Sequence, residues 1–298
     1  MESEEELWKQ LPKVEGEERA ELLMALCERA VNRDSGEEAL ALAETARDIY
    51  HSMGATAPSA DLARAYYWIS CSIKALGRTR EAAQALEKVL EIHREAHFPY
   101  LDDLLRTQAL WYGEVNDWTS ALHCQLEAVR LNEMDGNVEW TAKSVYNAGY
   151  CYSQIGEHGQ AILYFTEARR LFKRLRDVLN VGQCDERTAE SQIAMGDGEK
   201  ALKNGLRALD VANILQRDGL LLSAHFVVGQ ARMLTKDEEG ASIDFAVAKG
   251  LVQSCTEIDW SLLLKIEQAQ ADLFREDAPE FTQEIEKRIA SIKEILEE

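Results

Sequence analysis

The chain has 298 residues, and its 33 basic and 53 acidic side chains give a formal net charge of -20 at pH 7. This excess of negative charge disfavours nucleic acid and anionic lipid surfaces as partners, because both are themselves negatively charged. No apolar run reaches the roughly 20 residues that a membrane-spanning helix needs. The first residues are acidic where a secretory signal would be basic. We therefore expect a cytoplasmic protein.

Apolar positions recur with a helical period along the whole chain, and strand-type alternation is absent. The predicted helices span residues 18–33, 36–52, 60–76, 80–96, 100–114, 118–134, 138–155, 158–176, 179–195, 198–216, 219–235, 238–254, 259–275 and 280–297. Ahead of them, Leu7, Trp8 and Leu11 predict a short extra turn that packs on the first helix pair. The predicted fold class is therefore all-α.

An alanine returns about every 40 residues, which indicates stacked helix pairs. The periodic alanines are Ala39, Ala82, Ala121, Ala161, Ala201 and Ala241, with separations of 43, 39, 40, 40 and 40 residues. In most copies a helix-breaking residue stands five positions earlier, at Gly77, Asn116, Gly156 and Gly196. A repeat array grows by stacking and needs no second core, so we expect one continuous solenoid.

The copy from Ala142 to Arg176 is the clearest. Its small and bulky signature positions are Val145, Ala148, Gly149, Tyr152, Ala161, Phe165 and Ala168. This pattern resembles a tetratricopeptide repeat, and the 40-residue period is similar to the extended-helix subclass found in bacterial peptide-sensing regulators and kinesin light-chain arrays. Because paired helices cross closely only where facing residues are small, we expect Gly149 to face Ala161, with Tyr152 and Phe165 on either side.

The resemblance covers about residues 18 to 255 and implies a right-handed α-solenoid of six to seven helix pairs. We expect a single domain over residues 1–298, with an extension at 1–17, repeats at 18–255 and capping helices at 256–298. The last predicted helix carries an apolar stripe formed by Phe281, Ile285, Ile289, Ile292, Ile295 and Leu296. A terminal cap that stops end-to-end stacking is the favoured interpretation, and a homo-oligomer contact through the terminal helices is the alternative.

Motifs for catalysis or for metal and cofactor binding are scarce. His93 and His97 are spaced for one helix face, but Arg94 stands where a metalloprotease motif has glutamate, which favours a solvated helix end. His225 occupies a core position of its helix and is expected to be buried and hydrogen-bonded. The Gly196-Asp197-Gly198 sequence falls at the turn of a repeat. We expect no enzyme, no catalytic residue, no metal and no cofactor.

Six cysteines occur one at a time along the chain, without a paired spacing that would indicate a metal or redox site. They are Cys27, Cys71, Cys124, Cys151, Cys184 and Cys255. We interpret them as small core residues that remain reduced.

The resemblance also implies a binding surface, because the first helix of each pair faces the inside of a tetratricopeptide superhelix. Four basic side chains and three tyrosines fall at these positions in three consecutive copies. The complete candidate set is Arg64, Tyr67, Lys74, Arg106, Lys143, Tyr146, Asn147, Tyr150, Gln154, Phe226 and Gln230. A basic groove lined by aromatic rings fits an extended peptide that carries a carboxylate or acidic side chains. Ordinary solvated helix faces are the alternative interpretation.

Two classes of function follow from this surface. The first is a scaffold or regulator that holds an extended segment of a protein partner in the groove. The second is a receptor for a short signalling peptide or small molecule, similar to bacterial peptide-sensing regulators but without the helix-turn-helix that would precede the repeats. The two classes differ in the size of the ligand.

Overall fold

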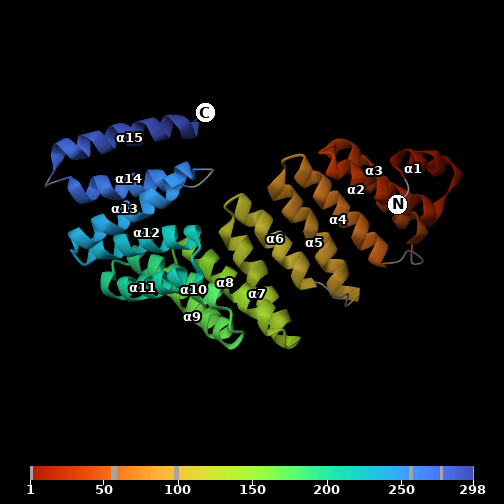
Figure 1. Cartoon of the computed structure of the whole chain (residues 1–298). Coiled ribbons are helices and arrows are strands. Elements are labelled where there is room, and N and C mark those ends of the chain that lie inside the picture. Colours follow the sequence, from red (N-terminus) through yellow and green to blue (C-terminus); the bar gives the residue numbers. More distant parts are fainter. Residues whose placement is uncertain (1–2, 55–58, 97–100, 255–257, 276–277, 298) are drawn as a thin grey trace. The chain divides into compact units, whose positions relative to one another are not determined.

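A computed structural model describes residues 3–54, 59–96, 101–254, 258–275 and 278–297. Over these ranges the chain forms fifteen α-helices, one 3-10 turn and no strand (Figure 1). Each of the fourteen predicted helices is present, and its ends lie within two residues of the predicted ones. The all-α fold class is therefore confirmed.

The helices pair in the order of the chain, with α1 (Glu4–Gln10) and the 3-10 turn η1 (Leu11–Lys13) before the first pair. The seven pairs are α2 (Gly16–Asn32) with α3 (Gly36–Met53), α4 (Ser59–Ala75) with α5 (Thr79–Ala96), α6 (Leu101–Glu114) with α7 (Trp118–Met134), α8 (Val138–Ile155) with α9 (His158–Arg174), α10 (Val178–Ala194) with α11 (Gly198–Leu215), α12 (Asp218–Leu234) with α13 (Glu238–Ser254), and α14 (Trp260–Phe274) with α15 (Pro279–Glu297).

Contacts divide the chain into two compact units, residues 1–137 and residues 138–298. Unit 1 contains the first three pairs and unit 2 contains the other four. Within unit 2, α10 contacts both α8 and α12, so the first helices of three consecutive pairs form one layer. A single continuous solenoid over both units stays a prediction.

The turns inside the pairs explain why a breaker residue recurs. Gly156 has a φ of 89°, a left-handed conformation that costs glycine little because it has no Cβ atom. After it, the backbone amide of Glu157 donates to the carbonyl of Tyr152 at 2.9 Å and closes the end of α8. The equivalent residues Gly77, Asn116 and Gly196 share the positive φ. Asp34 and Lys236 do so as well, although neither stands out in the sequence as a helix breaker.

The periodic alanines are all buried, as close helix crossing requires. The detailed expectation for the best-formed repeat needs correction. A Cβ atom added to Gly149 would lie 3.0 Å from the ring of Phe165 and 3.1 Å from Tyr164, and these are its nearest neighbours rather than Ala161. The ring of Phe165 therefore covers Gly149, and Tyr152 packs instead against Tyr164 with 5.0 Å between ring centroids.

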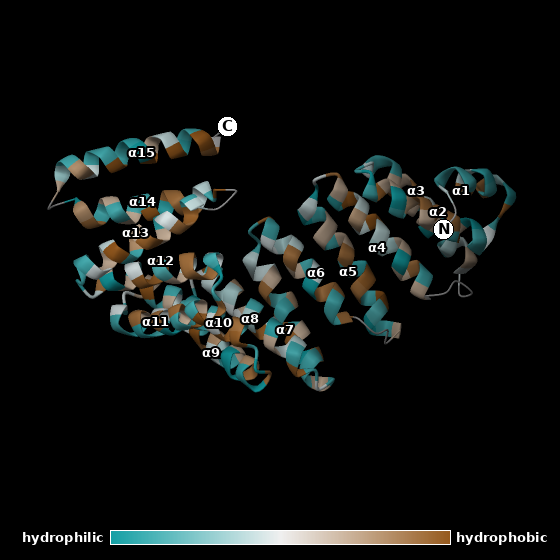
Figure 2. Ribbon diagram, viewed as in Figure 1, coloured by the Kyte–Doolittle hydropathy of each residue, from teal (hydrophilic) through white to brown (hydrophobic). Residues whose placement is uncertain are grey.

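Both ends of the chain differ from the repeats. Leu7 and Leu11 are buried in the core of the first pair, which confirms the extra turn, whereas Trp8 is 41% exposed. Hydrophobic and hydrophilic residues are interspersed along the helices (Figure 2). On α15 the buried part of the apolar stripe is Ile285 and Ile292, while Phe281 is exposed. The last helix thus covers α14 with only part of its stripe.

The described cysteines are all unpaired thiols, in agreement with the sequence analysis. Cys27, Cys124, Cys151 and Cys184 are buried, and Cys71 is half-buried. Burial raises the pKa of each thiol, to about 11 for Cys151 and about 12 for Cys184. Cys255 lies outside the described residues. No helix in the described ranges combines the length and the apolar composition that crossing a bilayer requires.

Candidate functional site

The predicted basic residues of unit 1 all have carboxylate partners. Arg64 Nη2 lies 2.8 Å from Asp61 Oδ1 in the same helix. Arg106 Nη1 lies 2.6 Å from Asp102 Oδ2, and Arg106 also pairs with Asp103.

Lys74 pairs with Glu114 on the first helix of the next repeat. The fourth predicted cation, Lys143 in unit 2, lies 2.7 Å from Glu139 and 4.0 Å above the ring of Trp140. The charges that the sequence analysis assigned to a ligand are therefore compensated within the chain.

The predicted tyrosines differ in their surroundings. Tyr67 is half-buried beside Trp68, with 5.7 Å between ring centroids, and burial raises its pKa to about 12. In unit 2, Tyr146 packs against Phe165 with 5.5 Å between ring centroids, and burial raises the pKa of Tyr146 as well. Tyr146 and Tyr150 are both half-buried on α8 and both approach the neighbouring helix α10.

Arg187 on α10 is the group that these two tyrosines hold. Its guanidinium lies 5.6 Å from the centre of the Tyr150 ring and shares a hydrogen bond with Tyr146. Its Nη1 atom lies 2.7 Å from Glu190 Oε2, one turn further along α10. Burial disfavours the charged form, but Glu190 and Tyr146 outweigh it and raise the pKa of Arg187 above its usual value. The cation is thus fixed in position on an aromatic support.

Glu186 precedes Arg187 and is far less accessible, with 9% of the residue exposed. Ser223 on α12 donates its hydroxyl hydrogen to Glu186 Oε2 at 2.9 Å. Burial, and then the neighbouring charge of Glu190, raise the pKa of Glu186 to about 7. A buried carboxyl group that titrates near neutral pH is more common at functional sites than elsewhere. We call Tyr146, Tyr150, Glu186, Arg187, Glu190 and Ser223 the Arg187 cluster.

The other predicted residues of unit 2 flank this cluster on α8 and α12. Asn147, Phe226 and Gln230 are half-buried, and Gln154 is exposed. The ring of Phe226 packs against Phe245 of the second helix, with 6.1 Å between centroids. The structure thus joins Tyr146 and Tyr150 to one cluster, while the other four lie beside it.

The candidate set chosen from the sequence favoured basic and aromatic residues. It left out Glu186, Glu190 and Ser223, although the repeat register directs all three inward, and it left out Arg187. Glu186, Arg187 and Glu190 stand 40 residues after Tyr146, Asn147 and Tyr150, so they occupy the same positions of the next repeat. That register was the signal that would have identified them. Arg187 occupies the same repeat position as Asn147, which is in the candidate set, one position away from those that the family pattern directs inward.

The histidine and glycine motifs noted in the sequence have structural roles where the structure describes them. His225 Nδ1 lies 2.8 Å from Asp244 Oδ1, which confirms the expected hydrogen bond, but the residue is half-buried and not buried as expected. Asp197 caps α11 by accepting the backbone hydrogen bond of Lys200, which confirms that this glycine-rich stretch is a turn. His97 lies outside the described residues. Within the described ranges, no group of three or more His, Cys, Asp or Glu side chains is arranged to hold a metal ion.

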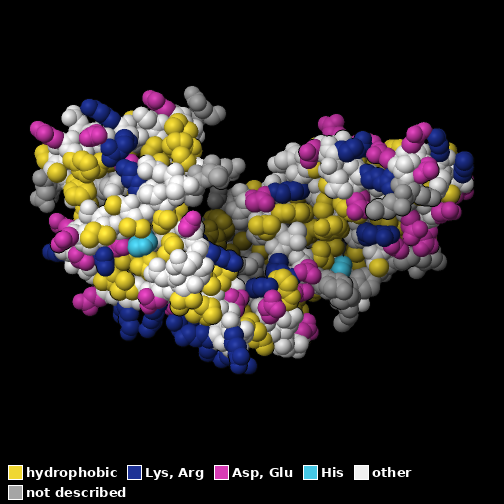
Figure 3. Space-filling model, viewed as in Figure 1, with side chains coloured by type: hydrophobic (Ala, Val, Ile, Leu, Met, Phe, Trp, Pro, Cys, Tyr) yellow, Lys and Arg dark blue, Asp and Glu magenta, His cyan; other side chains and the backbone are white. Residues whose placement is uncertain are grey.

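Exposed basic side chains of unit 2 instead gather on second helices. Figure 3 shows Lys and Arg side chains grouped over α9 and α11. On these two helices, the exposed members without an ion pair among the described residues are Lys173, Arg174, Lys203 and Arg207, and Arg176 follows in the turn after α9. They are available as controls for any charge effect on the first helices.

Comparisons with known proteins agree with this architecture. A family model for the tetratricopeptide repeat matches residues 63–95 and 142–171. No match was found among curated proteins.

Among solved structures, the apo form of RapI matches with a TM-score of 0.63 and 14% identity, over 92% of this chain and 76% of that one. PH0952, a signal transduction ATPase from Pyrococcus horikoshii with a tetratricopeptide repeat sensor, matches with a TM-score of 0.61 and 16% identity. The match covers 95% of this chain but only 40% of the ATPase. A Rap protein in complex with the competence and sporulation factor matches with a TM-score of 0.59 and 14% identity, over 93% of this chain and 76% of the Rap protein. These likenesses show the fold.

Proposed function

Because this chain is a tetratricopeptide repeat protein, we propose that it is a scaffold or regulator that binds an extended peptide segment of a protein partner on α8, α10 and α12. The observation that supports this proposal is the Arg187 cluster, in which two tyrosines of α8, a fixed cation and a buried carboxyl group of α10 and a hydroxyl group of α12 come together. Aromatic rings give contact area at low entropic cost, and fixed polar groups give register along a peptide backbone.

We further propose that Arg187 receives an acidic side chain or the terminal carboxylate of the ligand. Its guanidinium is already oriented by Tyr146 and Tyr150, so little conformational entropy is lost on binding. The side chain of Glu190 is 36% exposed and can turn aside to let a ligand carboxylate replace it. Arg106 would have to release two carboxylates, those of Asp102 and Asp103, and the ring beneath Lys143, that of Trp140, belongs to the same helix as Lys143.

This role is one of binding and not of catalysis. Arg187 and Glu186 are each engaged in a pair that fixes their position, which suits recognition of a ligand. A second candidate is a receptor for a short signalling peptide. The support for this candidate is that a Rap protein, which has a similar fold, was crystallised in complex with the competence and sporulation factor.

Selection of linear peptides from a displayed library on the immobilised protein tests the proposal. Enriched peptides should carry an acidic residue or a free carboxyl end, and should bind Arg187→Ala at least about tenfold more weakly than the wild type. Lys88→Ala and Arg207→Ala change exposed cations on second helices and should bind as the wild type does. Peptides that bind all four proteins equally would refute the assignment to this face. Mass spectrometry of the protein and small-ligand fractions captured from native lysate then separates the scaffold from the receptor.

A further inference from the structure

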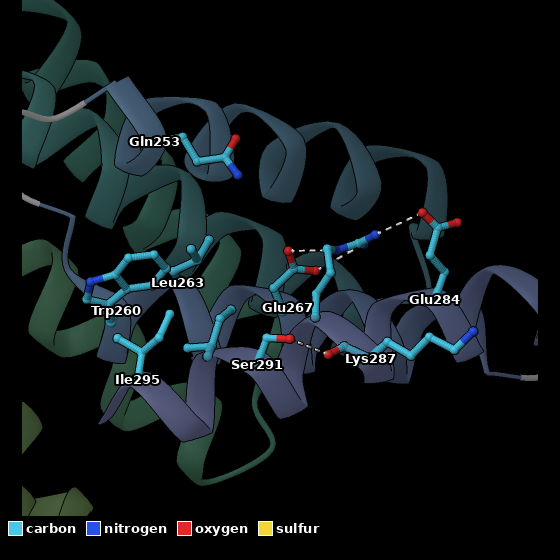
Figure 4. A pocket seen from close by; sticks show the side chains of 10 residues that line it. Gln253, Trp260, Leu263, Glu267, Glu284, Lys287, Ser291 and Ile295 are labelled. Atoms are coloured by element: carbon cyan, nitrogen blue, oxygen red, sulfur yellow. Dashed lines mark hydrogen bonds and ion pairs between the residues drawn. The ribbon is translucent and has the colours of Figure 1, made fainter. Parts of the chain in front are cut away.

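The last two helix pairs of unit 2 line a second, open site, far along the chain from the Arg187 cluster. A cavity of about 390 Å³ lies between the end of α13 and the helices α14 and α15 (Figure 4). Its lining residues are Gln253, Trp260, Leu263, Glu267, Glu284, Lys287, Arg288, Ser291, Ile292 and Ile295. A volume of this order falls at the lower end of the range of small-molecule sites.

One end of the cavity carries an excess of positive charge. Glu267 is 1% exposed, and its carboxylate is held by Lys249 Nζ at 2.6 Å and by Arg288, whose Nε and Nη2 atoms each lie 3.2 Å from a carboxylate oxygen. A buried carboxylate between two cations leaves one positive charge in excess. Lys287 adds another, since it is exposed and has no ion pair among the described residues. Glu284 adds one negative charge. The cations Lys249, Lys287 and Arg288 therefore outnumber the two carboxylates by one.

Glu284 is a weak competitor for Arg288. Its carboxylate lies 3.5 Å from Arg288 Nη1, and its side chain is 70% exposed. Arg288 therefore contacts both Glu267 and Glu284, and Figure 4 shows Glu284 at the opposite end of the cavity from the Trp260 ring. Since Glu267 already occupies one edge of the guanidinium, a ligand anion would take the edge that Glu284 now approaches.

The other end of the cavity is apolar. Leu263 and Ile292 form its buried floor, with 4% and 5% of each residue exposed. Trp260 and Ile295 lie at its rim, and Figure 4 shows them next to each other on α14 and α15. An indole ring with three aliphatic side chains provides a surface on which a ring or a short alkyl chain is removed from water.

We propose that this cavity binds a small amphipathic carboxylate, whose apolar body lies on Trp260, Leu263, Ile292 and Ile295 and whose anionic group lies at Lys287 and Arg288. The two ends of the cavity match the two ends of such a molecule. A neutral molecule would leave the cationic end unused, and a cationic one would meet Lys287 and Arg288 directly. This site is separate from the peptide-binding face proposed on α8, α10 and α12, and its ligand does not depend on the partner proposed for that face.

Three probes of equal chain length separate the contributions of the two ends. Octanoate, n-octanol and n-octylammonium are each titrated into the full chain by calorimetry, with tryptophan fluorescence as a second signal. Octanoate should bind with a dissociation constant below about 1 mM and at least about tenfold more tightly than either other probe. Equal binding of the three probes, or no binding of octanoate, would overturn the proposal.

Two neighbouring residues of α15 provide a matched control. Ile295 and Leu296 are 43% and 44% exposed, but only Ile295 lines the cavity. Ile295→Glu should weaken octanoate binding at least about tenfold through repulsion, whereas Leu296→Glu should have little effect. Glu284→Gln should strengthen binding, because it removes the competitor for Arg288. If the two glutamate variants bind octanoate equally, the ligand does not lie in this cavity. Arg187→Ala should leave octanoate binding unchanged, so failure of either proposal is seen separately.

Discussion

The hydroxyl of Ser223 on α12 donates to the carboxyl group of Glu186 on α10 at 2.9 Å, across two first helices whose residues are 37 positions apart. One hydroxyl is a small compensation for an acidic group with 9% of its residue exposed. Burial and the charge of Glu190 therefore prevail and raise the pKa of Glu186 to about 7. Glu186 is thus protonated in the folded chain over a pH range in which it is ionised in the unfolded chain.

The contribution of Glu186 to the stability of the protein should therefore fall as the pH rises from about 4.5 to about 7. In this window the folded state binds more protons than the unfolded state, so the free energy of unfolding decreases with pH. Glu186→Gln removes this contribution and keeps the hydrogen-bond acceptor. We expect the variant to be more stable than the wild type at pH 8 by roughly 1–3 kcal/mol, and the difference to vanish near pH 4.

Urea unfolding at several pH values measures the effect, as the difference between the variant and the wild type. Glu286→Gln on α15 is the control, because that carboxylate is exposed and has no ion pair among the described residues. It should leave the pH profile unchanged. A Glu186→Gln profile parallel to that of the wild type would mean that Glu186 is ionised in the folded protein at neutral pH.

A second prediction concerns the relative importance of the cations for peptide binding. Arg187→Ala should weaken the binding of a selected acidic peptide by roughly 1–3 kcal/mol, because it removes an oriented, partly buried charge-assisted contact. Arg106→Ala and Lys143→Ala should have smaller effects, since Arg106 is already paired with two carboxylates, those of Asp102 and Asp103, and Lys143 lies outside the Arg187 cluster. Calorimetric titration of one peptide into all three variants gives the order. A larger loss of peptide affinity in Arg106→Ala and Lys143→Ala than in Arg187→Ala would favour the site that the sequence analysis selected.

The difference between these two sites shows what a single sequence can and cannot determine. Helices and repeat register were predictable because buried alanines such as Ala161 and turn glycines such as Gly156 satisfy local steric requirements that recur with the repeat. The direction of a long charged side chain is not local. Arg106 turns back to Asp102, although its position in the repeat is one that faces inward in the family.

The Arg187 cluster required knowledge of contacts between repeats. Arg187 meets Tyr146, 41 residues earlier, because α10 packs beside α8 with a particular axial offset. A shift of one helical turn would place a different side chain at the same point, and sequence periodicity alone does not define the offset to that accuracy. The register nevertheless narrows the choice, since positions that follow one another at 40-residue spacing lie on neighbouring first helices.

A third prediction tests the turn conformation. Gly156→Ala should destabilise unit 2 by about 1 kcal/mol, because a Cβ atom is strained at a φ of 89°. Gly156→Asn should cost less, as asparagine tolerates this conformation and Asn116 already adopts it at the equivalent turn, with a φ of 57°. Urea unfolding measures both. Equal losses for alanine and asparagine would show that the turn relaxes out of the left-handed region.

The last prediction concerns the packing between α8 and α9. Gly149→Leu should destabilise the protein by roughly 1–3 kcal/mol or more, because even a Cβ atom at this position would lie 3.0 Å from the Phe165 ring and a whole isobutyl group has no room. Gly159→Leu is the matched control, since it makes the same substitution in the same helix pair at a glycine whose added Cβ atom would have no neighbour within 4 Å. That variant should be close to neutral, because Gly159 is the second residue of α9 and an added Cβ atom meets no neighbour there. If thermal melting shows equal effects for the two variants, α8 and α9 do not cross closely at Gly149.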